Sequence, residues 1–263
     1  MERYVVCLDP GHGPDTVNGS PDGAYKEREF TWDMGSRLRR LLEEQGIWVV
    51  MTREENEKPS LTQRAQVSNA SGANLFVSIH SNAAGSGWSE PQGLMIYTSA
   101  PGADAPRNIA ARDILTALRA AGVTIWGSGL GYESFTVLTA TAAPAVLIEY
   151  GFHTNREEVL LLLDPAYRER LAVATARGIC DFLGVEWQEQ EGALPDQPAP
   201  WAKDAWEKAV ALGILDGTAP QGMVTREMLA VVLDRCGLLG SGPVRRQTVR
   251  THPIKVKVRR YRR

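Results

Sequence analysis

Short apolar runs alternate with segments of helical period along the first 184 residues, and this alternation constrains the fold more than any other feature. The predicted strands span residues 4–8, 47–51, 75–79, 94–97, 135–138 and 145–148. The predicted helices span residues 27–45, 61–70, 104–121, 156–163 and 165–183. Strands that alternate with helices predict an α/β fold, in which helices cover both faces of a twisted, mostly parallel mixed sheet.

The pattern also makes two local predictions, one about a buried helix face and one about a loop. The helix at 104–121 is predicted to face the core with Ile109, Ile114, Leu115 and Leu118, which recur at helical spacing. Gly- and Ser-rich residues 127–131 are predicted to form a flexible loop, because glycine loses much conformational freedom when it is fixed in a strand.

The chain changes in composition after residue 184. Residues 185–200 are rich in Glu, Gln, Pro and Ala and are predicted to be a linker. Residues 201–240 are predicted to form a small helical region, with helices at 201–215 and 226–239. The last segment, 241–263, has no helical period and is predicted to be a basic disordered tail.

Charge is unevenly distributed. The net charge is −2, and residues 245–263 carry nine Lys or Arg and no acidic residue, so the rest of the chain carries −11. A body this acidic argues against nucleic acid as a partner. No apolar run is long enough to span a membrane, and no signal peptide precedes the first strand. We therefore expect synthesis in the cytoplasm, and action elsewhere only after release or lysis.

Cysteine usage predicts no disulfide framework. Cys7, Cys180 and Cys236 fall in separate elements, without the C-x-x-C spacing of metal or redox motifs. Free buried thiols are the expected state.

Polar residues follow the apolar strands where each strand ends. His12 stands in the run Asp-Pro-Gly-His-Gly after the first strand, His80 follows the third, and Glu149 follows the last. Glu27 opens the first helix. Ligand sites of open α/β sheets lie at the carboxyl ends of the strands. Two His and one carboxylate suit a catalytic zinc ion, and a second carboxylate can take a proton from water.

Five stretches resemble the zinc-dependent N-acetylmuramoyl-L-alanine amidases, the amidase-3 family, in that family's order. They are LDPGHG at 8–13, ERE at 27–29, MTR at 51–53, FVSIHSN at 76–82 and PAVLIEYGFHTN at 144–155. The resemblance covers residues 3–184. It implies that His12, Glu27 and His80 bind one Zn²⁺ and that Glu149 is the catalytic carboxylate. It also implies cleavage, by a zinc-activated water, of the peptidoglycan amide between the lactyl group of N-acetylmuramic acid and L-alanine.

Several site residues have a second interpretation. Glu29 is an alternative ligand to Glu27, but the two cannot both serve, since residues two apart on a helix point away from each other. The family pattern favours Glu27. Asn82 is a candidate substrate contact or a loop cap. His153 stands where the family usually has an apolar residue, and it is a candidate substrate contact or a structural histidine.

Two arginines near these motifs have a structural interpretation. Arg53 and Arg64 are expected to be ion-pair partners rather than substrate contacts.

Residues 201–239 resemble one S-layer-homology repeat, which implies a cell-wall-binding or dimerising module. The alternative is a small helical appendage. The basic tail predicts attraction to anionic wall polymers such as teichoic acids, or a solvated segment without a role.

Three functions remain open on the sequence. The first is a peptidoglycan amidase acting as a phage endolysin or as a mother-cell lytic enzyme. The second is another zinc hydrolase, a peptidase or deacetylase, although the sequence has no His-Glu-x-x-His motif. The third is a non-catalytic wall-binding protein with a vestigial metal site.

Overall fold

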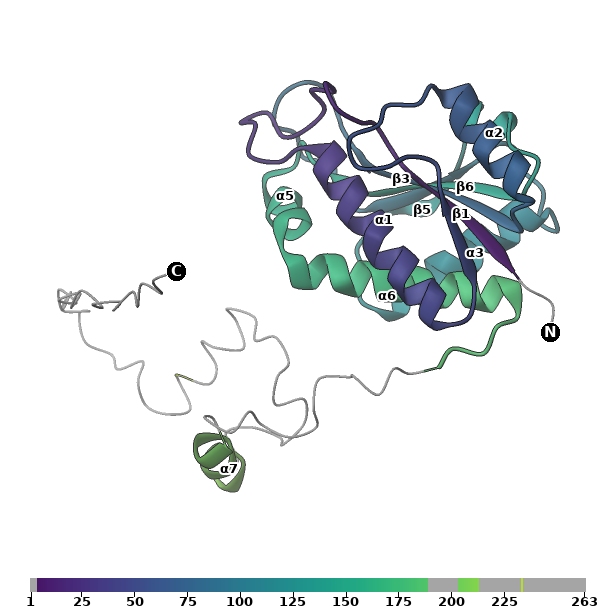
Figure 1. The fold of residues 1–263 in the computed structure, drawn as a ribbon. Coiled ribbons are helices and arrows are strands. Elements are labelled where there is room, and N and C mark those ends of the chain that lie inside the picture. Colours follow the sequence, from purple (N-terminus) through teal and green to yellow (C-terminus); the bar gives the residue numbers. More distant parts are fainter. Residues whose placement is uncertain (1–3, 189–202, 213–232, 234–263) are drawn as a thin grey trace, which may run out of the picture. The chain divides into compact units, whose positions relative to one another are not determined.

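The computed structural model describes residues 4–188, 203–212 and 233 (Figure 1). The chain divides into two units, Met1–Glu189 and Gln190–Arg263, and a single six-stranded sheet organises the first. The strands are β1 (Val5–Pro10), β2 (Trp48–Met51), β3 (Leu75–Asn82), β4 (Leu94–Thr98), β5 (Ile125–Tyr132) and β6 (Ala145–Phe152). Their spatial order is β2-β1-β3-β6-β4-β5.

Strand direction places three strand ends at one edge of the sheet. Strands β2, β1, β3 and β6 run parallel, β4 pairs antiparallel with β6, and β5 runs parallel to β4. The carboxyl ends of β1, β3 and β6 therefore lie side by side in adjacent strands. The register pairs His80 with Glu149 across β3 and β6. The predicted mostly parallel mixed sheet is confirmed.

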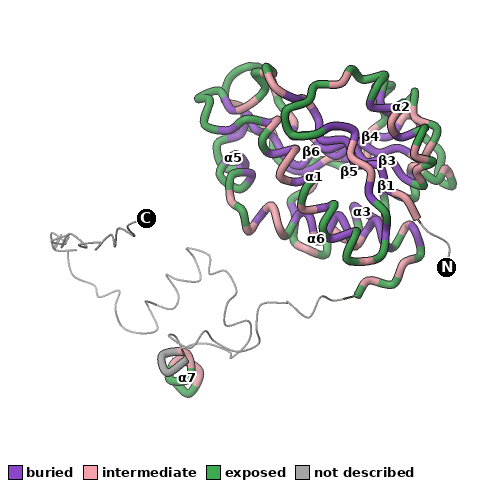
Figure 2. Tube along the Cα trace, viewed as in Figure 1, coloured by how far each residue is buried: buried purple, intermediate pink, exposed green. Residues whose placement is uncertain are grey.

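Helices cover both faces of this sheet. One face packs against α1 (Glu27–Glu44), α3 (Pro106–Ala120) and α6 (Pro165–Leu183), with α5 (Arg156–Leu163) beside α6. The other face packs against α2 (Leu61–Ser71) and the short α4 (Thr136–Thr139). Figure 2 shows the strands buried between these layers and the outer helix surfaces exposed. The predicted cover on both faces is confirmed.

Three helix boundaries, at Asn155, Asp164 and Gly184, show how capping residues set the length of a helix. Helices α5 and α6 span the residues predicted from the sequence. The side chain of Asn155 accepts hydrogen bonds from two backbone N–H groups of α5, and Asp164 caps α6 in the same way. Gly184 ends α6 in the left-handed conformation that glycine adopts without strain.

Three local predictions are wrong. Residues 135–138 do not form a strand, because helix α4 begins at Thr136 and buries Val137 and Leu138 against the sheet. The predicted loop at 127–131 lies within β5, whose pairing with β4 shifts so that the glycine-rich residues bulge out. Ile109 is 37% exposed, because α3 packs on α6 and the sheet through its other side.

The second unit contains one described helix, α7 (Lys203–Ala211), which lies within the helix predicted at 201–215. Residue 212 is a turn, and residues 201, 202 and 213–215 lie outside the described residues. The predicted helix at 226–239 (apart from residue 233), the basic tail and Cys236 lie outside the described residues. Cys7 and Cys180 are buried free thiols, as predicted. Among the described residues, none of the helices combines the length and the apolar character needed to cross a membrane.

Close packing between α3 and α6 depends on Gly178. A Cβ atom at this position would stand 2.4 Å from the Cα of Ile114. We predict that Gly178→Ala lowers the free energy of unfolding by about 1–3 kcal/mol, because two helix backbones must separate. Chemical denaturation measures this change. Gly87→Ala, where a Cβ atom meets nothing within 4 Å, is the control, and equal destabilisation of both variants would contradict the packing argument.

Candidate metal centre and catalytic cavity

The loop after β1 is held by side chains from three other elements. Arg64 of α2 donates to the backbone carbonyls of Pro10 and His12, and Arg53 donates to the carbonyl of Pro10. The hydroxyl of Thr31 on α1 donates to the carbonyl of Gly11. These carbonyls face inward, where hydrogen bonds replace water. The loop that carries His12 is thus fixed in position.

The turn after β1 depends on the backbone conformation of His12 and on the missing side chain of Gly11. His12 adopts a positive φ of 60°, a conformation that costs a non-glycine residue energy. A Cβ atom at Gly11 would lie 2.3 Å from the imidazole ring of His80. Only glycine leaves room for that ring at the loop, and the two histidines come together because of it.

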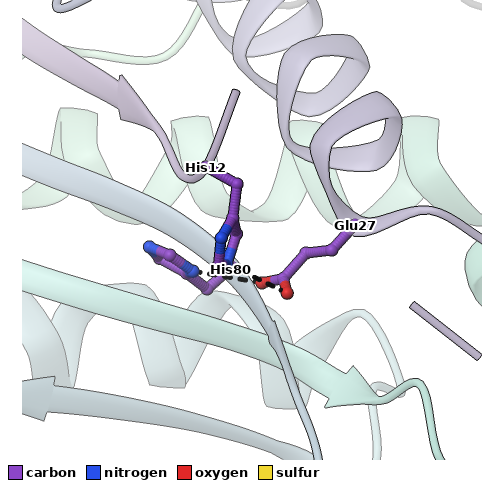
Figure 3. A group of neighbouring side chains, drawn as sticks. All are labelled: His12, Glu27 and His80. Atoms are coloured by element: carbon purple, nitrogen blue, oxygen red, sulfur yellow. Dashed lines mark hydrogen bonds and ion pairs between the residues drawn. The ribbon is translucent and has the colours of Figure 1, made fainter. Parts of the chain in front are cut away.

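His12, Glu27 and His80 form a cluster at the end of the sheet (Figure 3). His12 Nε2 lies 3.0 Å from Glu27 Oε2, and His80 Nδ1 lies 3.0 Å from Glu27 Oε1. The two imidazole rings meet edge to face, with centroids 4.9 Å apart. One ligand atom from each residue lies within 4.8 Å of the others, and no other group of this kind occurs among the described residues.

This donor set fits a zinc ion. Tetrahedral zinc with bonds of about 2.0–2.1 Å needs ligand atoms about 3.3 Å apart. The two imidazole nitrogens lie 3.0 Å from different oxygens of Glu27, and one ligand atom from each of the three residues lies within 4.8 Å of the others, which is in the range of that spacing. Two neutral imidazoles and a carboxylate also match the ligand chemistry of catalytic zinc, and they leave a fourth position for water.

The charges in the cluster stabilise one another. Burial alone would raise the pKa of Glu27, but hydrogen bonds with His12 and His80 outweigh it and hold the pKa well below its usual range. Burial lowers the pKa of His80, but the hydrogen bond with Glu27 and the negative charges of Glu149, Glu27 and Asp9 together outweigh burial and raise it overall. Because metal ligands must be unprotonated, metal binding at this cluster would release protons.

Glu29, the alternative ligand, lies away from the cluster. Its side chain is 59% exposed and pairs with Lys26 at 3.1 Å. Glu27 instead points inward from the first turn of α1, where the backbone N–H of Ser81 donates to Oε1 over 2.9 Å. The structure places Glu27, and not Glu29, beside the two histidines.

Glu149 lies next to the cluster on β6. None of the described residues gives a hydrogen bond to its buried Oε2 atom. Burial raises the pKa of Glu149 to about 7, with a further contribution from the Glu27 carboxylate and an opposing one from His80. A carboxyl that titrates near neutral pH can both accept and donate a proton.

These residues line one cavity of about 710 Å³. His12, Glu27, His80 and Glu149 form one part of its wall. Other lining residues come from the segment before α2 and its first residue, the end of β3, the segment around α4 and the residue after β6: Lys58, Pro59, Leu61, Asn82, Phe135, Thr136, Val137 and His153. The cavity is large enough for a substrate fragment rather than for an ion alone.

Asn82 and His153 both line this cavity, and each also has a structural contact. Asn82 Oδ1 accepts a hydrogen bond from the backbone N–H of Ala83, as a loop cap does. His153 is buried, with Nδ1 2.9 Å from Ser81 Oγ, and its ring stacks on Tyr25. Tyr25 and Ser81 were not predicted as site residues. They lie 56 positions apart in the sequence, and no motif spacing connects them with each other or with His153.

The arginines have structural roles. Arg64 pairs with Asp9 at 2.8 Å, and both side chains are buried, which agrees with the predicted ion pair. Arg53 contacts backbone carbonyls, and among the described residues no ion pair with a carboxylate was found for it.

Comparison with known protein families identifies the first unit. Residues 6–181 match the Amidase_3 family, described as N-acetylmuramoyl-L-alanine amidase. The chain belongs to this amidase family. The matched residues include the cluster, Glu149 and the whole sheet, so the family resemblance seen in the sequence is confirmed.

Relatives of this amidase come from several bacteria. It is 34% identical over 180 residues to the N-acetylmuramoyl-L-alanine amidase CwlM of Bacillus licheniformis, covering 66% of each chain. It is 31% identical over 199 residues to the germination-specific amidase of Bacillus subtilis strain 168, covering 70% of this chain and 81% of that one. The solved catalytic domain of CwlV from Bacillus (Paenibacillus) polymyxa var. colistinus is 32% identical with a TM-score of 0.62, covering 70% of this chain and 99% of that domain.

The raised pKa of Glu149 predicts a pH-dependent stability. A shift from 4.5 to about 7 corresponds to about 3 kcal/mol, at about 1.4 kcal/mol per pKa unit. In the metal-free amidase, the wild type should lose stability relative to Glu149→Gln as the pH rises from about 4.5 to about 7.5, because ionisation is favoured only in the unfolded chain. Denaturation of both proteins in chelator across this range measures the difference. A constant difference would contradict the raised pKa.

Proposed function

We propose that this amidase hydrolyses the peptidoglycan amide between the lactyl group of N-acetylmuramic acid and L-alanine, with one Zn²⁺ held by His12, Glu27 and His80. The observation that carries the proposal is the position of Glu149. Glu149 lies across the strand register from His80, in the same cavity as the two-histidine, one-carboxylate cluster, and none of the described residues donates a hydrogen bond to its buried Oε2. The names of the relatives support the substrate.

The protein residues around the cluster orient the ligands. The backbone N–H of Ser81 holds Glu27 Oε1, and the loop bonds from Arg53 and Arg64 hold His12. Such outer contacts fix ligand direction and support metal affinity. When bound, zinc supplies polarisation of the amide carbonyl and a more acidic water.

Glu149 performs the proton transfers. As a carboxylate it accepts a proton from the attacking water, and as the acid it gives that proton to the leaving nitrogen of L-alanine. Its pKa of about 7 suits both roles at neutral pH. Because none of the described residues donates a hydrogen bond to Oε2, this oxygen is available to accept a proton without displacing such a donor.

The alternative functions are supported less well. A peptidase or deacetylase would also use a zinc ion and a carboxylate, but the family match favours the amidase. A wall-binding protein with a vestigial site has no use for a buried carboxyl that lowers stability when it ionises. The intact set of His12, Glu27, His80 and Glu149 therefore favours catalysis.

Two biological roles are predicted for this amidase. One prediction is a mother-cell lytic enzyme of sporulation. The relative from Bacillus subtilis is named germination-specific, which supports wall hydrolysis in spore-forming bacteria but not this particular role. A phage endolysin remains the other prediction. Wall-polymer binding or dimerisation through residues 201–240 also stays a prediction, because most of that region lies outside the described residues.

The roles assigned to His12 and Glu149 predict different failures. Glu149→Ala should retain zinc and lose hydrolysis by a factor of about 10²–10⁴, the usual contribution of a general acid–base group. His12→Ala should lose both zinc and hydrolysis. Metal content after dialysis and the rate of amide cleavage check the pair. Loss of zinc in the Glu149 variant with retention in the His12 variant would show that the roles are assigned wrongly.

The reaction itself predicts a specific new end group. Purified peptidoglycan incubated with the amidase should release free amino-terminal L-alanine. Chelator should abolish the release and added zinc should restore it. New reducing sugar ends or other peptide termini would identify a different hydrolase, and no release would support the binding protein.

A further inference from the structure

A chain of three hydrogen-bonding side chains leads from the protein interior to the cavity. The Tyr25 hydroxyl donates to Ser81 Oγ over 2.8 Å, and Ser81 Oγ lies 2.9 Å from Nδ1 of His153. All three side chains are buried. His153 lines the cavity, so the chain ends at the site where substrate would bind.

The hydrogen-bond partners of Tyr25 and Ser81 determine the direction of their hydroxyl protons and thereby the tautomer of His153. Among the described residues, Ser81 Oγ is the one partner of the Tyr25 hydroxyl, so the Tyr25 proton points to Ser81. The Ser81 proton is then free to point to Nδ1 of His153, its other partner. A neutral imidazole that accepts at Nδ1 carries its proton on Nε2. The ring edge with Nε2 is the edge that Ser81 does not occupy.

The other tautomer leaves a buried proton without an acceptor. If Nδ1 carried the proton, it would donate to Ser81, through Oγ or the nearby backbone carbonyl. In either case Nδ1 no longer accepts from Ser81, and none of the described residues provides another acceptor for the Ser81 hydroxyl proton. An unsatisfied buried donor costs about 1–3 kcal/mol, a factor of about 5–150 in the tautomer ratio. Burial also lowers the pKa of His153, which keeps the ring neutral at pH 7.

We propose that His153 presents Nε2–H to the cavity as a hydrogen-bond donor to a carbonyl oxygen of the bound substrate, and that Tyr25 and Ser81 fix this tautomer. This proposal rests on the proposed function, since it takes the acceptor from the lactyl-peptide segment of peptidoglycan. His153 would contact substrate, whereas Tyr25 and Ser81 act through it as positioning residues. Ser81 also holds Glu27 through its backbone N–H, so one residue orients both the metal ligand and the donor.

Two substitutions at His153 distinguish the effect of losing the N–H donor from the effect of losing the aromatic ring. Gln can place an amide N–H near the position of Nε2, whereas Phe keeps the flat ring and has no donor. With peptidoglycan and zinc, we expect kcat/KM of His153→Phe to fall by about ten-fold or more, the effect of one lost donor. His153→Gln should remain within about three-fold of the wild type. Equal losses in the two variants would overturn the donor role.

The tautomer has a readout that does not require activity. Nitrogen-15 NMR of the full chain labelled in its histidine rings should show Nδ1 of His153 unprotonated and Nε2 protonated, with His153→Gln used for assignment. Tyr25→Phe frees Ser81 and should allow both tautomers. Tyr150→Phe is the matched control, because it removes an equally buried hydroxyl that bonds to Thr175 instead. A protonated Nδ1 in the wild type would overturn the proposal.

A binding measurement separates this proposal from the proposed function. N-acetylmuramoyl-L-alanyl-D-isoglutamine added to the zinc-loaded wild type should shift the Nε2–H resonance of His153. Absence of a shift overturns the donor role even if L-alanine ends are released. A shift without any release from peptidoglycan supports the donor and rejects the proposed hydrolysis.

Discussion

The buried Asp9 carboxylate connects the elements that build the site. Its oxygens accept hydrogen bonds from Arg64 at 2.8 Å, Thr52 at 2.6 Å and Ser78 at 2.7 Å. These partners come from α2, the residue after β2, and β3. A buried ion pair is costly to break, by about 3–5 kcal/mol, because removal of one partner leaves an uncompensated charge. Asp9 therefore ties the end of β1 to its neighbours just before the chain turns toward His12.

Glu27 is a second buried carboxylate that connects several elements, and it lies in the candidate metal centre itself. Its carboxylate joins a helix, α1, to the ends of two strands through the side chains of His12 and His80. The backbone N–H of Ser81 provides a further bond. The two imidazole rings and the Ser81 N–H compensate the buried charge of Glu27 when no ion is bound. The same arrangement already holds the candidate ligands close together. By contrast, none of the described residues donates a hydrogen bond to Oε2 of Glu149. The proposed roles of metal ligand for Glu27 and proton carrier for Glu149 rest on this difference.

Sequence periodicity predicted best where an element buries one continuous face and has a capping residue. Helices α5 and α6 match their predicted bounds, because Asn155, Asp164 and Gly184 mark the ends. It failed where tertiary contacts override local preference. Residues 135–138 have the apolar content of a strand but form a helical turn over the sheet, and a bulge accommodates the glycines of β5.

Candidate site residues could be predicted because parallel strands end at one edge, which brings His12, His80 and Glu149 together whatever lies between them. Glu27 and Glu29 could not be separated by spacing, since both open the same helix, and the direction of α1 decides which one points inward. The Tyr25–Ser81–His153 chain had no sequence signal, because its residues lie 56 and 72 positions apart.

The sequence by itself determined the α/β architecture and the residue types at the strand ends, because periodicity and turn chemistry are local. Only the tertiary structure decided which carboxylate lies between the histidines, which carboxyl has an oxygen without a hydrogen bond from the described residues, and which histidine nitrogen bonds to Ser81. Those properties depend on distances of about 3 Å between residues far apart in the chain, and hydrogen bonding is that sensitive to distance.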